Sequence, residues 1–142
     1  MKKILNLIAL ILQTSIFLFG ALVFITSILG FNKLQNTQAS DIGTAIGVGF
    51  GSVILLLFAI FSAIYSLVAL VPFIMKLVRN FGRGRGFDIV AIVFDSLLII
   101  VNAVLMVVSL ESYALYIFVA LLAVNIACIV LNSITVKYPA GR

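Results

Sequence analysis

Asp95 is an acidic residue in an unusual environment for a reactive group, because it lies inside the mostly apolar stretch DIVAIVFDSLLIIVNAVL at 88–105. An ionisable residue inside a membrane-spanning segment is taken as functional by default, because a carboxyl there can exchange a proton or a cation. Two states are open for it. Asp95 is either protonated, because burial disfavours a charged carboxylate, or kept ionised by a basic residue from segment 76–85.

Polar residues near Asp95 recur at intervals of seven, which places them on one stripe of a helix that drifts by about 20° per repeat. They are Asp88, Asp95, Asn102 and Ser109. The last apolar segment carries a matching pair seven residues apart, Asn125 and Asn132. If the two segments form an antiparallel hairpin, the sequence numbers of any two residues at equal depth add up to the same value. The pair Asp95 and Asn132 and the pair Asn102 and Asn125 give one common value. We therefore expect Asp95 to face Asn132 and Asn102 to face Asn125.

The expected polar cluster inside the membrane consists of Asp95, Asn102, Asn125, Asn132 and Gln13. Unpaired polar groups in hydrocarbon cost several kcal/mol, so facing one another is the least costly arrangement. Interhelical hydrogen bonds in membranes contribute only about 0.6 kcal/mol on average. The cluster is therefore expected to set the register of the helices more than their stability, and to open toward the cytoplasm.

Other reactive chemistry is sparse. The sequence has no His, four acidic residues and one cysteine, Cys128, so neither a metal site nor a cofactor is expected. No nucleophile lies in a pattern with a base, and an enzyme is not expected. The RGRG at 83–86 does not match a phosphate-binding loop, and its position beside a bilayer argues against a nucleic-acid partner.

The composition predicts the elements that position these residues. With 65% hydrophobic and 9% charged residues, the chain has far fewer charges than a soluble domain. Four apolar runs, at about 4–30, 43–75, 89–110 and 113–136, are each long enough to cross the hydrocarbon as a helix. The prediction is an all-α polytopic membrane protein, a single domain over 1–142 whose four helices form an up-down bundle.

Basic residues predict the orientation, because they concentrate on the cytoplasmic side. They precede the first run, separate the second from the third and follow the last, whereas the other two connections hold only Lys33. Both termini are therefore expected in the cytoplasm. The residues between the second and third runs are expected to contact anionic lipid headgroups or the cytoplasm: Lys76, Arg79, Arg83 and Arg85.

The second run is too long for a straight crossing, so it is expected to kink at Pro72. At its outer end Gly43, Gly47 and Gly51 recur every four residues, a pattern that lets helix backbones approach closely. Contact within the chain is favoured over a dimer seam. Asp88 is expected to be the N-cap of the third helix.

Two functions are compatible with these features. The first is a small non-catalytic membrane protein that acts as an accessory, assembly or immunity-like partner of another membrane protein. The second is a small oligomeric proton- or cation-coupled transporter or channel that uses Asp95. In both cases the expected partners are a bilayer with anionic headgroups and either another membrane protein or further copies of the chain. The short basic start and small loops suggest a bacterial cytoplasmic membrane.

Overall fold

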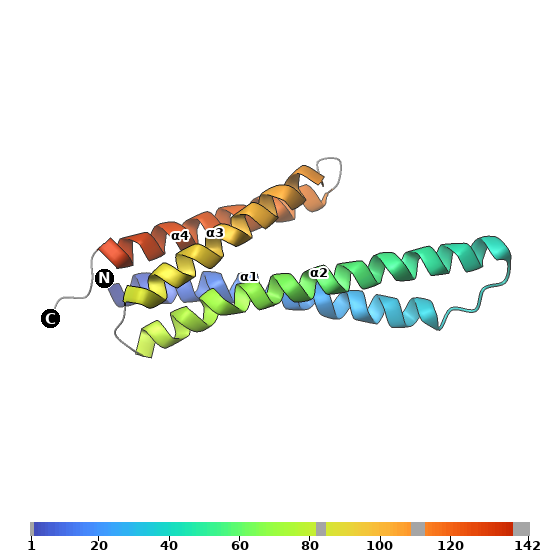
Figure 1. Ribbon diagram of the computed structural model, residues 1–142, viewed down its shortest axis with the longest axis horizontal. Helices are drawn as coiled ribbons and strands as arrows, with labels where there is room; N and C mark the ends of the chain where they lie inside the picture. The colour runs from blue at the N-terminus through green and yellow to red at the C-terminus, as the bar shows by residue number, and fades with distance from the viewer. Residues whose placement is uncertain (1, 82–84, 109–112, 138–142) are drawn as a thin grey trace. The chain divides into compact units, whose positions relative to one another are not determined.

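A computed structural model describes residues 2–81, 85–108 and 113–137, and these form four α-helices in sequence. They are α1 (Lys2–Gln35), α2 (Ile42–Phe81), α3 (Arg85–Val108) and α4 (Ala114–Lys137) (Figure 1). Each helix is long and apolar enough to cross a membrane, with a mean hydropathy of 2.4 to 2.7 over its most apolar window. The fold is all-helical and compatible with a four-helix membrane bundle.

Helices α1 and α2 are longer than the apolar runs that predicted them. Their 34 and 40 residues correspond to roughly 50 and 60 Å of helix, against a hydrocarbon core of about 30 Å. Helix α1 continues through 31–35, beyond the apolar run that ends near residue 30, and Leu34 packs there against Gly51 of α2. Pro72 lies inside α2, and the α-helix continues on both sides of it.

The chain divides into two compact parts whose boundaries fall inside α1 and α2. The first part, called here the core part, comprises residues 1–17 and 67–142 and contains α3 and α4 complete. The second, the hairpin part, comprises residues 18–66.

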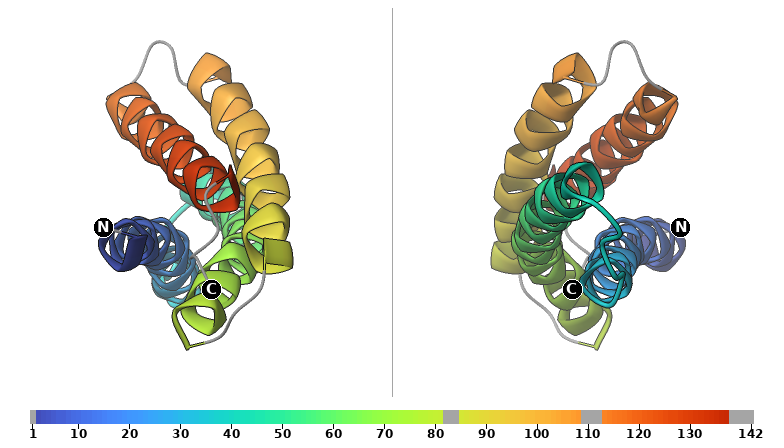
Figure 2. Two further views of the ribbon diagram at one scale, coloured as in Figure 1. Left: turned by 90° about the vertical axis from the view of Figure 1, so that its left-hand side faces the viewer. Right: turned by 90° about the vertical axis from the view of Figure 1, so that its right-hand side faces the viewer.

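In the core part, α3 and α4 run antiparallel and side by side (Figures 1 and 2). The amino-terminal half of α1 and the carboxyl-terminal half of α2 belong to the same part, and Phe17 stacks on Phe73 with ring centroids 5.7 Å apart. The buried side chains of this part include small ones, Ala9, Ala69 and Ala91, and larger apolar ones such as Ile16 and Leu98 beside its buried polar residues.

In the hairpin part, α1 and α2 are in tight contact at Gly20. A Cβ at this position would lie 2.6 Å from Ser66 Oγ and 3.0 Å from a ring carbon of Tyr65. A Cβ at this position requires a neighbour to shift, because real Cβ atoms essentially never lie closer than 3.0 Å to another heavy atom. The Ser66 hydroxyl also donates a hydrogen bond to the Ser62 carbonyl O at 2.7 Å, which limits how it can move.

The three glycines expected to form a packing face behave differently from one another. A Cβ on Gly51 would lie 2.8 Å from a methyl group of Leu34, so this glycine does allow close contact between α1 and α2. A Cβ on Gly47 would meet nothing within 4 Å, and one on Gly43 would meet only the neighbouring Asp41 carboxyl. The regular spacing therefore marks one contact between helices within the chain, not three.

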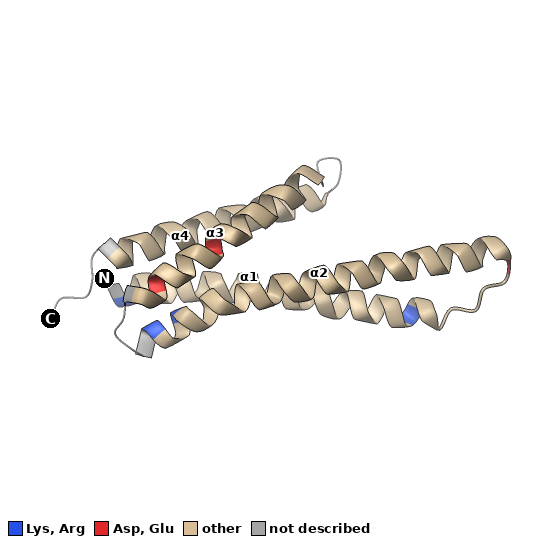
Figure 3. Cartoon of the chain, in the orientation of Figure 1, with Lys and Arg blue, Asp and Glu red and all other residues tan. Residues whose placement is uncertain are grey.

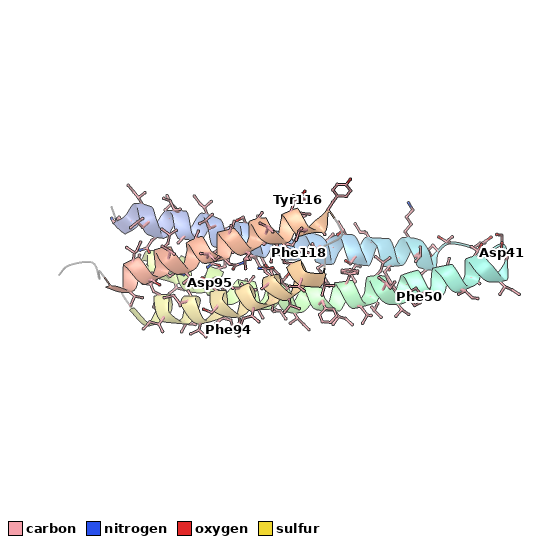
Figure 4. The ribbon with its side chains drawn as sticks, turned by 90° about the horizontal axis from the view of Figure 1, so that it is seen from above. Asp41, Phe50, Phe94, Asp95, Tyr116 and Phe118 are labelled. Carbon is pink, nitrogen blue, oxygen red and sulfur yellow. The ribbon has the colours of Figure 1, made fainter. Side chains whose placement is uncertain are left out.

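Helix α2 begins after Asp41, which is its N-cap. The backbone N–H of Thr44 donates a hydrogen bond to Asp41 Oδ1 at 2.6 Å, and Asp41 lies at the exposed start of the helix (Figure 4). This hydrogen bond lowers the pKa of the Asp41 carboxyl below its usual value. A negative charge is also favoured at the positive end of the helix.

Candidate functional site

The candidate site is the buried polar core inside the core part. On α3 the fully buried residues follow a spacing of three and four, which places them on one face of the helix. They are Asp88, Ala91, Asp95, Leu98 and Asn102. On α4 the same spacing holds for Leu121, Asn125, Cys128, Asn132 and Thr135. Helix α1 contributes Ala9, Gln13 and Ile16, so the buried faces of α1, α3 and α4 in this part carry both polar and apolar residues.

Asp95 is fully buried and hydrogen-bonded by two other helices (Figure 4). Gln13 Nε2 on α1 donates to both carboxyl oxygens at 2.7 Å. Asn132 Nδ2 on α4 donates to Asp95 Oδ2 at 3.1 Å. The contact with Asn132 is the pairing expected from the constant-sum rule. The carboxyl thus joins α1, α3 and α4 at one level through charge-assisted or amide hydrogen bonds.

The second expected pairing, Asn102 with Asn125, is not a direct hydrogen bond. Both residues are fully buried, but neither Oδ1 accepts a hydrogen bond from a described residue. Asn125 Nδ2 donates instead to the carbonyl O of Leu121 in its own helix, at 2.9 Å. An amide in an apolar interior can be satisfied by the preceding turn of its helix, which the constant-sum rule does not consider. Asn102 takes part in other interactions.

A buried ion-pair cluster lies one heptad before Asp95, at Asp88 of α3. Lys76 Nζ donates to Asp88 Oδ1 at 2.7 Å, and Arg79 Nε donates to Asp88 Oδ2 at 3.1 Å. The side chains of Lys76 and Asp88 are both fully buried, and that of Arg79 is 11% exposed. Figure 3 shows the acidic positions of α3 and the basic ones near the end of α2. The three residues fasten the end of α2 to the start of α3.

Two expectations are corrected by this cluster. Asp88 is not the N-cap of α3, because the helix begins at Arg85 and Asp88 lies in its first turn, where its carboxylate binds α2 side chains. Lys76 does not face lipid headgroups, because it is buried to 1% exposure. Arg79 also turns toward Asp88. Arg83 lies outside the described residues, and the side chain of Arg85 is likewise outside them.

Sequence reasoning missed the ion pair although a signal was present. The connection between α2 and α3 is short, so the two helices run antiparallel near it and the constant-sum rule applies to them as well. A buried charge is stable only when it is paired and hydrogen-bonded. Lys76 and Asp88 have opposite charges and lie twelve residues apart across this connection, so this ion pair could have been predicted.

Two further amide oxygens in the core accept no hydrogen bond from the described residues: Gln13 Oε1 and Asn132 Oδ1. Among the described residues no three His, Cys, Asp or Glu side chains gather as metal ligands. The core can therefore hold helices in register and offer oxygen acceptors around one acid.

Comparisons with protein-family models, with curated proteins and with solved structures find no match to this chain.

Proposed function

We propose that this chain is a non-catalytic integral membrane protein that works by binding another membrane protein, as an accessory, assembly or immunity-like subunit. The observation that carries the proposal is that the two buried acids of the described residues, Asp88 and Asp95, are both bound by other side chains of the same chain. Asp95 is held by amides of two other helices, and Asp88 is held by Lys76 and Arg79. Charged groups used in this way specify helix register and are not presented to a substrate.

The outward surface fits the same role. Large apolar side chains on every helix are exposed in the isolated chain, for example Leu22, Phe61, Ile100 and Val130. In a bilayer such a surface faces lipid or the apolar helices of a partner, and association there depends on packing between helices. A second copy of this chain is the other partner that such a surface admits.

The proposal includes a topology. Both termini lie in the cytoplasm and the helices alternate up and down, because the basic residues gather at one end of the predicted spans. Helix α2 kinks at Pro72, which removes one backbone N–H from the ladder. The side of the membrane that holds both termini faces the anionic headgroups of what we propose is a bacterial cytoplasmic membrane.

The alternative is a proton- or cation-coupled transporter or channel that uses Asp95. One observation favours it: the amide oxygens of Gln13 and Asn132 beside Asp95 accept no hydrogen bond from a described residue. Asp95 is then an exchange site and the amides are its lining. Four helices enclose little space, so this function requires an oligomer.

Two measurements separate these functions. Purified wild-type and Asp95→Asn chains are placed in liposomes that carry a proton gradient, and proton and cation flux are recorded. If the chain is an accessory subunit, liposomes with the wild-type chain and with Asp95→Asn should show the same background leak of protons and cations. Flux in the wild type that Asp95→Asn abolishes, in a protein that remains folded, would establish transport and refute the accessory function.

Partner binding is tested in native membranes by site-specific photo-crosslinking. A diazirine side chain is introduced at Ile100, which is 61% exposed, and at Leu98, which is fully buried two residues away. We expect a discrete adduct with one membrane protein, or with a second copy, from position 100 and none from position 98. Lipid adducts alone at position 100, and at further exposed positions on α1, α2 and α4, would contradict the proposal.

A further inference from the structure

Helix α2 extends past the end of α1 in the hairpin part. Leu34 lies in the last turn of α1 and packs against Gly51, so residues 42–50 of α2 lie beyond this contact. These residues, called here the overhang, correspond to roughly 13 Å of helix. The connection 36–41 runs alongside the overhang, from the end of α1 to the start of α2 (Figure 1).

This connection places the overhang outside the hydrocarbon of the bilayer. Residues 36–41, with the sequence NTQASD, are all exposed and form neither helix nor strand. Irregular backbone that faces lipid does not occur within the hydrocarbon, because its N–H and C=O groups would find no partners there. The overhang lies level with this connection and is therefore outside the hydrocarbon as well. The rest of α2 can cross without it, since the helix from Gly51 to Lys76 measures roughly 38 Å, against a hydrocarbon core of about 30 Å.

The overhang is apolar, and the described residues leave much of it uncovered. Ile42, Ile46 and Phe50 lie four residues apart on one stripe of the helix, and they are 82, 67 and 70% exposed. Beside this stripe, a Cβ on Gly47 or Gly49 would meet nothing within 4 Å. Leaving one such large side chain in water forgoes about 1.5–3 kcal/mol of burial. A bare helix end rich in glycine would also fray, because each glycine costs about 1 kcal/mol of helix stability relative to alanine.

We propose that the overhang is a docking helix, which inserts into an apolar groove on the extramembrane surface of the membrane protein that this chain binds. The inference rests on the proposed function and adds the binding surface and the chemistry of the partner. Lipid chains do not reach the overhang, because it lies level with the connection 36–41. A second copy fits poorly: two-fold symmetry within one membrane would place the exposed Asp41 carboxylate opposite its own equivalent, and like charges oppose that pairing. A helix held in a groove by apolar side chains one turn apart is a recurrent mode of recognition.

The test compares two exposed phenylalanines of α2, one inside the overhang and one beyond it. Phe50→Cys and Phe61→Cys are made in a Cys128→Ala background, which removes the only native thiol, and the two positions are 70 and 68% exposed. In nanodiscs with purified chain, a membrane-impermeant maleimide should label position 50 at least about tenfold faster than position 61, because hydrocarbon disfavours the reactive thiolate. In native membranes the labelling of position 50 should slow by at least about tenfold, because the bound partner covers it.

A charge placed in the overhang tests whether this protection comes from docking. Ile46→Lys in the Phe50→Cys chain should restore labelling in native membranes to the rate in nanodiscs, because an apolar groove excludes an unpaired ammonium group. Gln38→Lys is the matched control, since Gln38 is an exposed polar residue of the neighbouring connection, and it should leave the protection unchanged. Circular dichroism and gel filtration confirm that each compared chain is folded.

Several results would overturn the proposal. Slow labelling of Phe50→Cys in nanodiscs means that lipid covers the overhang, and labelling of Phe61→Cys at the same rate removes the boundary between overhang and hydrocarbon. Unchanged labelling of Phe50→Cys in native membranes, or protection that survives Ile46→Lys, means that no groove holds the overhang. A disulfide between two copies of the Phe50→Cys chain in native membranes means that the partner is a second copy. If any of these results appears while the diazirine at Ile100 still crosslinks to another membrane protein, this inference fails and the proposed function stands.

Discussion

Breaking the buried ion pair between α2 and α3 should have an asymmetric effect on stability. Asp88 is bound by two basic residues, Lys76 at 2.7 Å and Arg79 at 3.1 Å. The ammonium of Lys76 is fully buried and donates to Asp88. Asp88→Leu leaves the Lys76 charge buried without its partner, which costs about 3–5 kcal/mol of unfolding free energy. Lys76→Met leaves Asp88 still bound by Arg79, so its cost is smaller, about 2 kcal/mol.

The double variant gives the sharper expectation. Lys76→Met combined with Asp88→Leu replaces both charges by apolar side chains of similar size, and such replacements are often close to neutral. Arg79 is partly exposed and can extend its guanidinium toward solvent. The double variant should therefore be at least about 2 kcal/mol more stable than Asp88→Leu alone.

The assay is equilibrium unfolding in mixed micelles, followed by circular dichroism, with all variants in one detergent system. Leu77→Met is the matched control, because Leu77 is 39% exposed beside Lys76, and its effect should stay within about 0.5 kcal/mol. A double variant no more stable than Asp88→Leu would refute the reasoning, because it would mean that the Lys76 charge is not buried against Asp88.

The remaining predictions concern the hairpin part and its helix start. Gly20→Ala should lower the unfolding free energy by about 1–3 kcal/mol, because its Cβ would lie 2.6 Å from Ser66 Oγ. Gly47→Ala in the same assay should be neutral or slightly stabilising, because its Cβ would meet nothing within 4 Å; equal losses in the two variants would contradict the described packing. The hydrogen bond to Asp41 lowers its pKa below the usual 3.8, so its stabilisation of the α2 start is complete above pH 4 and is lost as the pH falls through the lowered pKa. Exchange of backbone amides in the first turn of α2, converted to opening free energies, should show this loss, and Asp41→Ala should abolish the pH dependence.

The sequence by itself determined the class of the protein and one register. Four apolar runs in a chain with few charges can be satisfied in a bilayer only as helices, because their backbone groups have no other partners there. The sevenfold spacing placed Asp95 and Asn132 at one level, and the structure contains their hydrogen bond. Both inferences follow from periodicity along a helix and from a short turn, which are local properties of the chain.

The tertiary structure decided which side chains meet when several partners were possible. Lys76 or Arg79 could have bound Asp95, but both donate to Asp88, and Gln13 of α1 donates to Asp95. Of the regularly spaced glycines only Gly51 lies in a close contact, while Gly20, which belongs to no repeat, has the tightest one. The physical reason is that composition and spacing indicate which face of a helix is buried, whereas partners on other helices depend on how those helices are rotated and crossed in three dimensions.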